Sequence, residues 1–229
     1  MNQATPTLSS NHSTDYTTIS FPGLQLKTRD GHKVRGYFGR LFQEQSPLLH
    51  NHFDDGSPLY RYPMVQYKVV NRTAHLIGIK QGSQLLNELF FKMEELRIED
   101  QVYPLSTKQL QNEQISPHVS PKLHRYKWET PWMGLNQKNY RLYRTLSGRD
   151  QHDFLEKILR NQLVGFLKEM GASLDTPILV NARLHKVPVQ VKNQSMMGFL
   201  GSFVCNVELP PLLGIGKFSS RGFGTILPT

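Results

Sequence analysis

Hydrophobic and polar positions in the first half of the chain follow a pattern that predicts six elements. Apolar residues at every second position are typical of strands, and apolar residues three or four positions apart are typical of helices. The predicted order is strand, helix, strand, strand, helix, strand, over Ile19–Lys27, Gly31–Phe42, Tyr62–Val70, His75–Ile79, Ser83–Met93 and Leu96–Tyr103. This is the order of the ferredoxin-like unit, so we expect residues 19–104 to form one such domain.

The pattern of the second half is less regular. It predicts a strand, a helical tract in two pieces, a hairpin and a strand-rich run, over Lys122–Glu129, Asn136–Leu146, Gln151–Met170, Ile178–Leu184, Val187–Val191 and Met196–Leu209. We expect residues 105–229 to form a second, decorated ferredoxin-like domain with two helical segments in place of one. The predicted fold class is therefore α+β, with tandem ferredoxin-like (RRM-like) domains and a C-terminal glycine-rich loop.

Residues 1–18 form a tail rich in Ser, Thr and Asn that we expect to be disordered. The tail contains no Lys or Arg and no apolar stretch, which argues against a signal peptide or a membrane anchor. No long apolar run occurs elsewhere in the sequence. These features predict a cytoplasmic protein that does not associate with membranes.

Charge is unevenly distributed along the chain. Its 229 residues include 27 Lys and Arg against 18 Asp and Glu, a formal net charge of +9. Of these, 16 basic but only 8 acidic residues follow residue 104. A positive field in the second half favours a polyanionic partner, although basic surfaces also serve solubility. The single cysteine, Cys205, excludes an intramolecular disulfide and a multi-cysteine metal cluster.

The segment 214–224 is a glycine-rich loop that carries two cations, Lys217 and Arg221. Its glycines are Gly214, Gly216, Gly222 and Gly224. Glycine permits positive φ and close approach of a partner, and the N–H groups of such a loop suit a phosphate. A tight turn without a ligand is the other interpretation. The chain has no Gly-Lys-Ser/Thr phosphate loop and no Gly-x-Ser-x-Gly elbow, which argues against a nucleotidase or a serine hydrolase.

The candidate catalytic motif is His50-Asn51-His52, in a polar segment after the first predicted helix. In an extended chain His50 and His52 face the same side, roughly 6.6 Å apart. Three interpretations remain open: polar surface, two ligands of a zinc or copper site, or an acid–base pair at a phosphodiester. The adjacent Asp54-Asp55-Gly56 is typical of a turn.

An acid–base pair of histidines suits one reaction in particular. RNA is cleaved without a metal when its own 2′-hydroxyl attacks the adjacent phosphorus, while a base removes the hydroxyl proton and an acid protonates the departing 5′-oxygen. Histidine titrates near neutral pH and can serve either role. Tyr60 and Arg40 lie close in sequence and are candidates for stabilising charge on the phosphorus oxygens.

Basic and aromatic residues alternate in two segments, 125–128 and 140–144. Alternating rings and cations are typical of grooves that bind single-stranded RNA. For Trp128 and Trp132 we favour a position in the core. The candidate RNA contacts are Arg141, Arg144 and Arg149.

Several of these motifs, in this order, resemble the CRISPR-associated endoribonucleases that cut precursor CRISPR RNA within its repeats (the Cas six family), and in particular the subtype B branch. The resemblance runs from about Ile19 to Ile226. It rests on Arg35-Gly36-Tyr37-Phe38-Gly39, His50-Asn51-His52, Tyr62-Pro63-Met64-Val65-Gln66-Tyr67-Lys68, Thr130-Pro131-Trp132-Met133-Gly134-Leu135-Asn136 and the C-terminal Gly-Ile-Gly-(x)5-Gly-Phe-Gly loop. The polar tail before Ile19 departs from relatives, which tend to begin close to their first strand.

The resemblance implies a metal-independent endonuclease without a cofactor, which leaves a 5′-hydroxyl and a 2′,3′-cyclic or 3′-phosphate end. It places base and acid on His50 and His52, in an order that it does not assign. It implies that Tyr60 is the third catalytic residue beside the two histidines, and that Arg40 is a weaker candidate for phosphate stabilisation.

The resemblance also implies that the glycine-rich loop contacts the RNA backbone, with Lys217 and Arg221 pairing with phosphates. The expected partner is a precursor CRISPR RNA repeat, single-stranded or weakly structured. A homodimer, formed through self-complementary sheets and edges, and association with a CRISPR interference complex are open alternatives.

Two other functions stay open at the level of sequence. A non-catalytic RNA-binding subunit of a ribonucleoprotein would use the same fold and loop, but it has no need of His50 and His52. A metal-dependent enzyme would use the two histidines together with Asp54 or Asp55.

Overall fold

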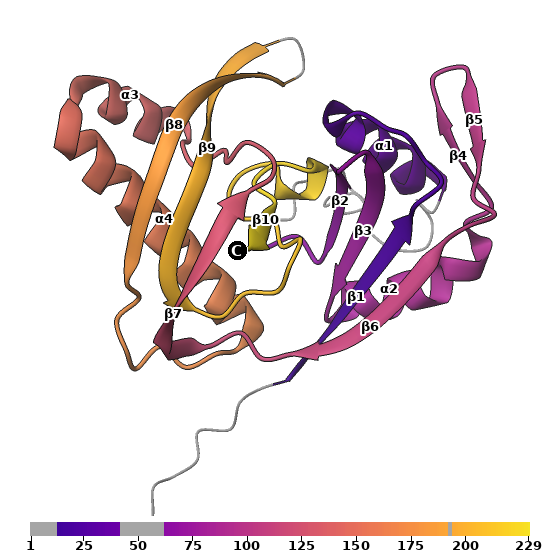
Figure 1. The fold of residues 1–229 in the computed structure, drawn as a ribbon, viewed down its shortest axis with the longest axis horizontal. Coiled ribbons are helices and arrows are strands. Elements are labelled where there is room, and N and C mark those ends of the chain that lie inside the picture. The colour runs from indigo at the N-terminus through magenta and orange to yellow at the C-terminus, as the bar shows by residue number, and fades with distance from the viewer. Residues whose placement is uncertain (1–12, 42–61, 192–193) are drawn as a thin grey trace, which may run out of the picture.

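The computed structural model describes residues 13–41, 62–191 and 194–229. These residues form two four-stranded sheets, each with helices packed on one face (Figure 1). A separate two-stranded hairpin extends from the first sheet. No helix in the described part of the chain is both long enough and apolar enough to cross a membrane.

The first sheet is antiparallel, with the strand order β2-β3-β1-β6. Its elements are β1 (Thr14–Phe21), η1 (Thr28–Asp30), α1 (Gly31–Leu41), β2 (Val65–Val70), β3 (Thr73–Ile79), α2 (Gln81–Leu89), η3 (Phe90–Lys92) and β6 (Gln109–Ile115). The last strand of the sheet lies beside the first, and the two central strands are β3 and β1. This is the ferredoxin-like arrangement, so the fold predicted for the first domain is confirmed.

The last strand of this sheet lies outside the range predicted for it. Residues 96–103 fall in the separate hairpin, β4 (Glu95–Ile98) and β5 (Gln101–Pro104). The strand that pairs with β1 is β6, in which every residue before Ile115 is exposed. An exposed edge strand needs no apolar alternation, so the hydrophobic pattern carried no signal for it. The division between the domains therefore falls between Ile115 and Val119 instead of at residue 104.

Strand β1 begins within the segment predicted as a tail. Residues 14–18 belong to the strand, and Tyr16 and Thr17 are buried. Tyr16 donates a hydrogen bond to the Pro211 carbonyl at 2.6 Å, and Thr17 Oγ1 lies 2.6 Å from Ser83 Oγ. The prediction of disorder is thus wrong for residues 14–18, because their polar groups find partners inside the protein. Residues 1–12 of that tail lie outside the described residues.

The second sheet is also antiparallel, with the strand order β10-β7-β9-β8. Its elements are β7 (Val119–Trp128), α3 (Gln137–Thr145), α4 (Gly148–Met170), β8 (Val180–Val191), β9 (Gln194–Val207) and β10 (Ile226–Pro228). Between β9 and β10, where a ferredoxin-like unit has its second helix, the described chain has only the 3-10 helix η4 (Ser219–Arg221). The glycine-rich loop therefore occupies the place of a helix in the chain order.

The hairpin predicted over residues 178–191 is wrong, because these residues contribute one continuous strand. The hairpin is formed instead by β8 and β9. Pro188 lies within β8, which is an edge strand of the sheet. An edge position tolerates proline, because the missing N–H is not needed for a second neighbour.

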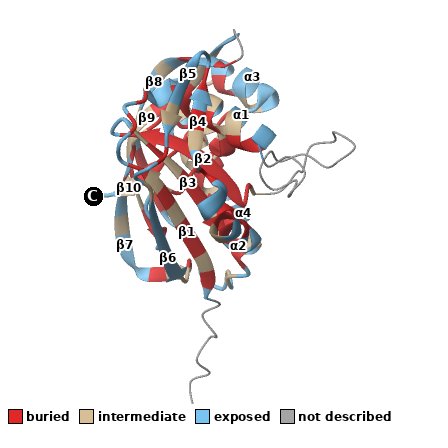
Figure 2. Cartoon of the chain, turned by 90° about the vertical axis from the view of Figure 1, so that its right-hand side faces the viewer, coloured by how far each residue is buried: buried red, intermediate tan, exposed pale blue. Residues whose placement is uncertain are grey.

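Two large hydrophobic cores and one small cluster are buried among the residues that the structure describes. The first lies between the first sheet and its helices and includes Ile19, Phe38 and Leu86. The second lies between the second sheet and α4, and it also contains residues of the first domain, namely Tyr16, Met64, Ile77 and Ile79. The two domains therefore share a core, and the buried colour of β1, β2 and β3 in Figure 2 follows from burial on both faces.

The aromatic residues of the second core follow the prediction made for them. Trp128 and Trp132 are buried and stack with ring centroids 5.6 Å apart. Cys205 is a free, buried thiol in the same core. Burial raises the pKa of this thiol to about 11, which makes it a poor nucleophile.

Candidate functional site

The predicted catalytic residues fall mainly outside the described part of the structure. His50, His52 and Tyr60 belong to residues 42–61, as do Asp54 and Asp55. No geometry of the predicted acid–base pair is therefore available, and these assignments remain predictions. The structure does describe both ends of this segment, because α1 ends at Leu41 before it and Tyr62 follows it.

Tyr62 is the first described residue after the segment that carries the histidines. Its hydroxyl donates a hydrogen bond to the Gly214 carbonyl at 2.6 Å, and its ring packs on Phe166 with centroids 5.0 Å apart. Gln66 Nε2 donates to the Tyr62 oxygen at 2.9 Å. The histidine-bearing segment thus rejoins the described structure directly beside the glycine-rich loop.

Arg40, the other predicted catalytic residue, is exposed in the last turn of α1. Gly31, at the opposite end of α1, packs against the glycine-rich loop, since a Cβ there would lie 3.1 Å from the Arg221 carbonyl oxygen. Arg40 lies nine positions after Gly31, about 14 Å along the helix axis. The structure does not bring Arg40 to the described cations of the loop.

The glycine-rich loop is packed between the two domains, as the yellow segment in Figure 1 shows. Toward the first domain, the Gly214 N–H donates to Gln66 Oε1 at 2.9 Å. Toward the second domain, the Gly224 N–H donates to the Pro131 carbonyl at 2.9 Å, and the Lys217 N–H donates to the Met133 carbonyl at 3.0 Å. Backbone groups of the loop are therefore used to join the domains.

Burial explains why glycines occur at these positions. Gly214, Gly222 and Gly224 are buried, and Gly216, Gly222 and Gly224 have positive φ. At Gly222, with φ of +92°, a Cβ would also lie 3.1 Å from the Tyr67 carbonyl oxygen. Glycine is thus required for close packing and backbone conformation. RNA contact by the glycines themselves remains a prediction.

The side chains of the two cations, in contrast, reach the surface. Lys217 is exposed and Arg221 is partly exposed. Lys217 Nζ and the Arg221 guanidinium carbon each lie 5.6 Å from the centre of the Phe218 ring. Phe218 has positive φ of +61°, which turns the chain sharply between the two cations. The predicted pair of phosphate-binding side chains is therefore brought together around one aromatic ring.

A third cation lies near this pair. Arg35 comes from α1, and burial, followed by the charge of Arg221, lowers the pKa of its guanidinium. A like charge that shifts a pKa must be close. Positive charge from α1 and from η4 therefore converges where the loop meets the first domain. Arg35 was not among the predicted site residues, although it lies in the Arg35-Gly36-Tyr37-Phe38-Gly39 motif.

Lys68 is buried on β2 beneath the loop. Its ammonium nitrogen has no hydrogen-bond partner among the described residues, and burial lowers its pKa to about 7. A Cβ at position 214 would lie 2.6 Å from Lys68 Nζ. His75 is the cross-strand neighbour of Lys68, and burial together with the Lys68 charge lowers its pKa to about 4. The burial of Lys68 was not predictable from the sequence pattern, because lysine is almost never fully buried without a partner.

A groove opens beside the two cations. It has a volume of about 510 Å³ and is bounded by the start of α3, by the loop, and by the end of the β8–β9 hairpin at which Val191 pairs with Gln194. Its lining residues are Leu135, Asn136, Gln137, Tyr140, Val191, Gln194, Ser195, Met196, Met197, Lys217, Phe218 and Arg221. This is the part of the described structure in which apolar, amide and cationic groups converge.

The predicted arginines of the second domain divide into two sets. Arg141 and Arg144 are exposed on α3, one and four residues after the groove residue Tyr140. Residues three or four positions apart lie on one helix face, so Arg144 shares the face of Tyr140. Arg149 is separate, because it lies in the first turn of α4 and pairs with Asp153 at 3.8 Å.

In the other alternating segment, 125–128, the aromatic and the basic side chains point to opposite faces of the sheet. Tyr126 and Trp128 are buried in the core, whereas Arg125 and Lys127 are exposed on the opposite face of β7. Across β9, the register places Lys127 beside Ser202 and Ser202 beside Arg183 of β8. Lys127 and Arg183 therefore lie on either side of Ser202 on the open face of the second sheet, and Lys127 also pairs with Glu129 at 2.7 Å. Strand alternation after residue 125 was the available signal for this face.

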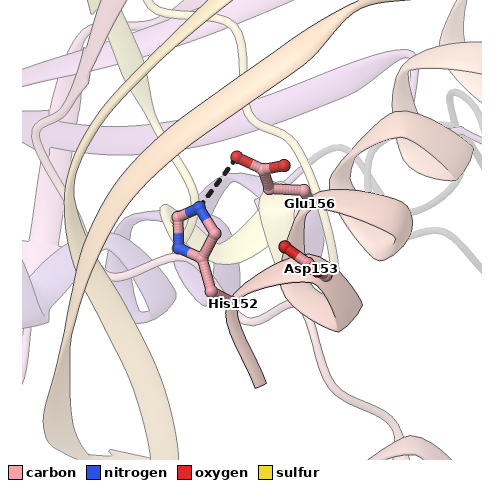
Figure 3. A group of neighbouring side chains, drawn as sticks. All are labelled: His152, Asp153 and Glu156. Carbon is pink, nitrogen blue, oxygen red and sulfur yellow. Dashed lines mark ion pairs between the residues drawn. The ribbon is translucent and has the colours of Figure 1, made fainter. Parts of the chain in front are cut away.

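One grouping of side chains with metal-ligand chemistry occurs in the described residues, on α4 (Figure 3). His152 Nε2 pairs with Glu156 Oε1 at 3.1 Å. Glu156 Oε1 also accepts the Ala182 N–H at 2.8 Å, and Asp153 pairs with Arg149. These contacts attach α4 to the edge of β8 and balance surface charge, so they explain the grouping without an ion.

Comparisons with known proteins place both domains in one family description. Residues 12–116 match the family model described as the Cas6b N-terminal domain, and residues 118–229 match the Cas6b C-terminal domain. A solved structure described as Cas6b is 34% identical, with 95% of this chain and 100% of that chain covered and a TM-score of 0.90.

Two further relatives extend the comparison. A solved structure described as the CRISPR RNA processing endoribonuclease Cas6b is 30% identical, with 95% of this chain and 100% of that chain covered and a TM-score of 0.77. An uncharacterised protein of Methanocaldococcus jannaschii is 27% identical over 143 residues, which is 62% of this chain and 97% of that protein.

Proposed function

The chain belongs to the Cas6b family, and from this premise we propose that it is an endoribonuclease that cleaves precursor CRISPR RNA within its repeats to generate guide RNAs. The observation that carries the proposal is the match of both domains to that family, including 30% identity to a protein described as a CRISPR RNA processing endoribonuclease. The cationic loop beside Tyr62 supports it, because it lies where the histidine-bearing segment ends.

The proposed reaction needs no metal. One of His50 and His52 takes the proton of a 2′-hydroxyl, and the 2′-oxygen attacks the adjacent phosphorus. The bond from phosphorus to the 5′-oxygen breaks, and the other histidine donates a proton to that oxygen. The products are a 2′,3′-cyclic phosphate, which can open to a 3′-phosphate, and a 5′-hydroxyl. Tyr60 and Arg40 stabilise negative charge on the phosphorus oxygens.

The proposed RNA contacts lie in the second domain and the loop. Lys217 and Arg221 pair with phosphates of the repeat, and Arg141 and Arg144 extend this charge along α3. Further contact comes from Arg149, from the backbone of the glycine-rich loop, and from Lys127 and Arg183 on the open face of the second sheet. This arrangement separates RNA positioning from the histidines that carry out the cleavage.

The test is cleavage of a repeat RNA from the organism's own genome, in EDTA. We expect cleavage at one position by the wild type, and none when the attacking 2′-hydroxyl is replaced by hydrogen. The double variant His50→Ala/His52→Ala should bind the RNA and cleave it at least about 100-fold more slowly, since one acid–base group is worth about 10² to 10⁴ in rate. The control variant, His32→Ala/His152→Ala, removes two exposed histidines and should cleave normally.

Two outcomes would replace the proposal. Binding without cleavage of any repeat by the wild type would identify a non-catalytic RNA-binding subunit. Cleavage that EDTA abolishes would identify a metal-dependent enzyme that uses the same histidines with Asp54 or Asp55. A homodimer, membership of a CRISPR interference complex and a cytoplasmic location belong to the same proposal and are tested by co-purification and sizing from the native cell.

A further inference from the structure

We propose that the groove between α3, the β8–β9 hairpin and the glycine-rich loop binds one unstacked nucleotide of the repeat RNA, with its base on Tyr140, Met196 and Met197 and its phosphate on Lys217 and Arg221. This inference rests on the proposed function, because it names a subsite for the same RNA.

The size of the groove suits a nucleotide. Its volume of about 510 Å³ lies within the roughly 300 to 1,000 Å³ of small-molecule pockets. Residues from three parts of the sequence build it, namely from 135–140, from 191 together with 194–197, and from 217–221. A cavity assembled from three segments presents a defined shape, unlike a scatter of surface cations.

The floor of the groove suits the face of a base. Met133, Val189 and Val191 form a small buried cluster against which Met196 and Phe218 pack. This cluster supports the floor from below, so the floor is apolar and held in place. Methionine adapts to flat ring systems through its flexible, polarisable side chain. A site for phosphates alone would need no such floor.

Tyr140 supplies an aromatic wall. It lies on α3 and is 37% exposed, although large aromatic residues are mostly buried elsewhere in this protein. Base stacking on an exposed aromatic ring is the usual means of binding unpaired nucleotides. Amide groups of Asn136, Gln137 and Gln194 line the same groove and can bond to base edges.

The charge at one end of the groove suits a phosphate. Lys217 and Arg221 both lie against the Phe218 ring, which itself lines the groove. The first turn of α3 borders the groove as well; Asn136 Oδ1 accepts the Asn139 N–H at 2.7 Å, and the positive end of the helix dipole favours an anion. No Asp or Glu is among the described residues that line the groove. A neutral ring at one end and an anion at the other match a nucleotide.

A second pocket gives the path of the strand. It has a volume of about 280 Å³ and shares Tyr140, Met196 and Met197 with the groove. Its far side contains Lys186 of β8. The RNA strand therefore runs from Lys217 across the two methionines toward Lys186, with Tyr140 between the neighbouring sites.

The experiment uses the His50→Ala/His52→Ala protein and single-stranded repeat RNAs that carry 2-aminopurine at successive positions. One position should show a change in fluorescence on binding that Tyr140→Ala removes and Tyr140→Phe keeps. An abasic nucleotide at that position should weaken binding by about 10-fold, as expected for one stacked base. The matched control is Phe91→Ala, which removes an aromatic ring that is 82% exposed on the first domain and should have no effect.

The decisive result is whether the loss of affinity caused by Tyr140→Ala and the loss caused by the abasic nucleotide are coupled or additive. With Tyr140→Ala the abasic substitution should cost no further affinity, and thermal melting of the variant should match that of the parent. Additive losses, or no position that responds to Tyr140, would overturn the inference. If wild type cleaves repeats but shows no coupling, this subsite alone is wrong. If coupling is found without cleavage, the proposed catalysis alone is wrong.

Discussion

At the scale of single residues, Lys68 is the side chain least expected from the sequence. It is fully buried, and Gly214 makes room for its ammonium group. Burial disfavours the charged form, so the pKa falls from an ordinary 10.5 to about 7. The neighbouring His75 is shifted in the same way, from 6.5 to about 4. Both side chains therefore lower stability when they are protonated in the folded state.

These shifts predict a dependence of stability on pH. Between pH 7 and 10.5 the unfolded chain holds a proton on Lys68 that the folded chain lacks, so the free energy of unfolding should rise with pH. His75 gives a similar rise between pH 4 and 6.5. One pKa unit corresponds to about 1.4 kcal/mol, so the total rise amounts to several kcal/mol. Urea unfolding at successive pH values measures it.

The variant Lys68→Met separates the two contributions. Methionine has similar length and no charge, so we expect the variant to be more stable at pH 7 by about 1 to 3 kcal/mol. The rise above pH 7 should disappear, whereas a rise between pH 4 and 6.5 should persist. A variant less stable than the wild type, together with no rise above pH 7 in the wild type, would show that Lys68 is charged and paired in the folded state.

At the scale of elements, the hydrophobic pattern predicted the helices and strands that have a buried face. It failed for a strand that is almost fully exposed and for a strand that is unusually long. Helix α1 and strands β2, β3 and β9 lie close to their predicted ranges. β6 was missed because almost all of its side chains face solvent. β8 was divided in two at His185 and Lys186, because these two exposed polar residues interrupt the apolar positions in the middle of an edge strand.

The glycine-rich loop shows the same contrast within one element. Its sequence predicted both a tight turn and an anion site, and the packing assigns the buried glycines to the turn. The groove beside it was not predictable, because its residues come from three distant segments whose meeting depends on tertiary structure. The two loop cations were predictable, because charge next to glycine is visible in the sequence.

The loop cations should account for a measurable part of the RNA affinity. With Lys217→Ala/Arg221→Ala we expect weaker binding and a salt dependence whose slope falls by roughly one to two units, because each phosphate contact releases about one counterion. The measurement is the RNA dissociation constant at several salt concentrations. The control is Lys92→Ala/Arg97→Ala, two exposed cations on the first domain. An unchanged slope in the loop variant would remove the loop from the RNA contact.

At the scale of the whole molecule, the tandem ferredoxin-like architecture was predicted from the order of elements. Its shared core was not, because Tyr16, Met64, Ile77 and Ile79 belong by sequence to the first domain alone. This core, together with the hydrogen bonds of the loop, fixes the domains against one another. If RNA binds the second domain as proposed, it is held at a fixed position relative to the start of β2, where the histidine-bearing segment ends.

The most direct test of the proposed chemistry is the mass of the RNA ends produced in EDTA. The 2′-hydroxyl mechanism requires an upstream product that ends in a 2′,3′-cyclic phosphate, before any opening to a 3′-phosphate, and a downstream product that begins with a 5′-hydroxyl. We expect both ends from the wild type in EDTA and neither from His50→Ala/His52→Ala. A 3′-hydroxyl paired with a 5′-phosphate would contradict the mechanism, because those ends require attack by water on the phosphorus.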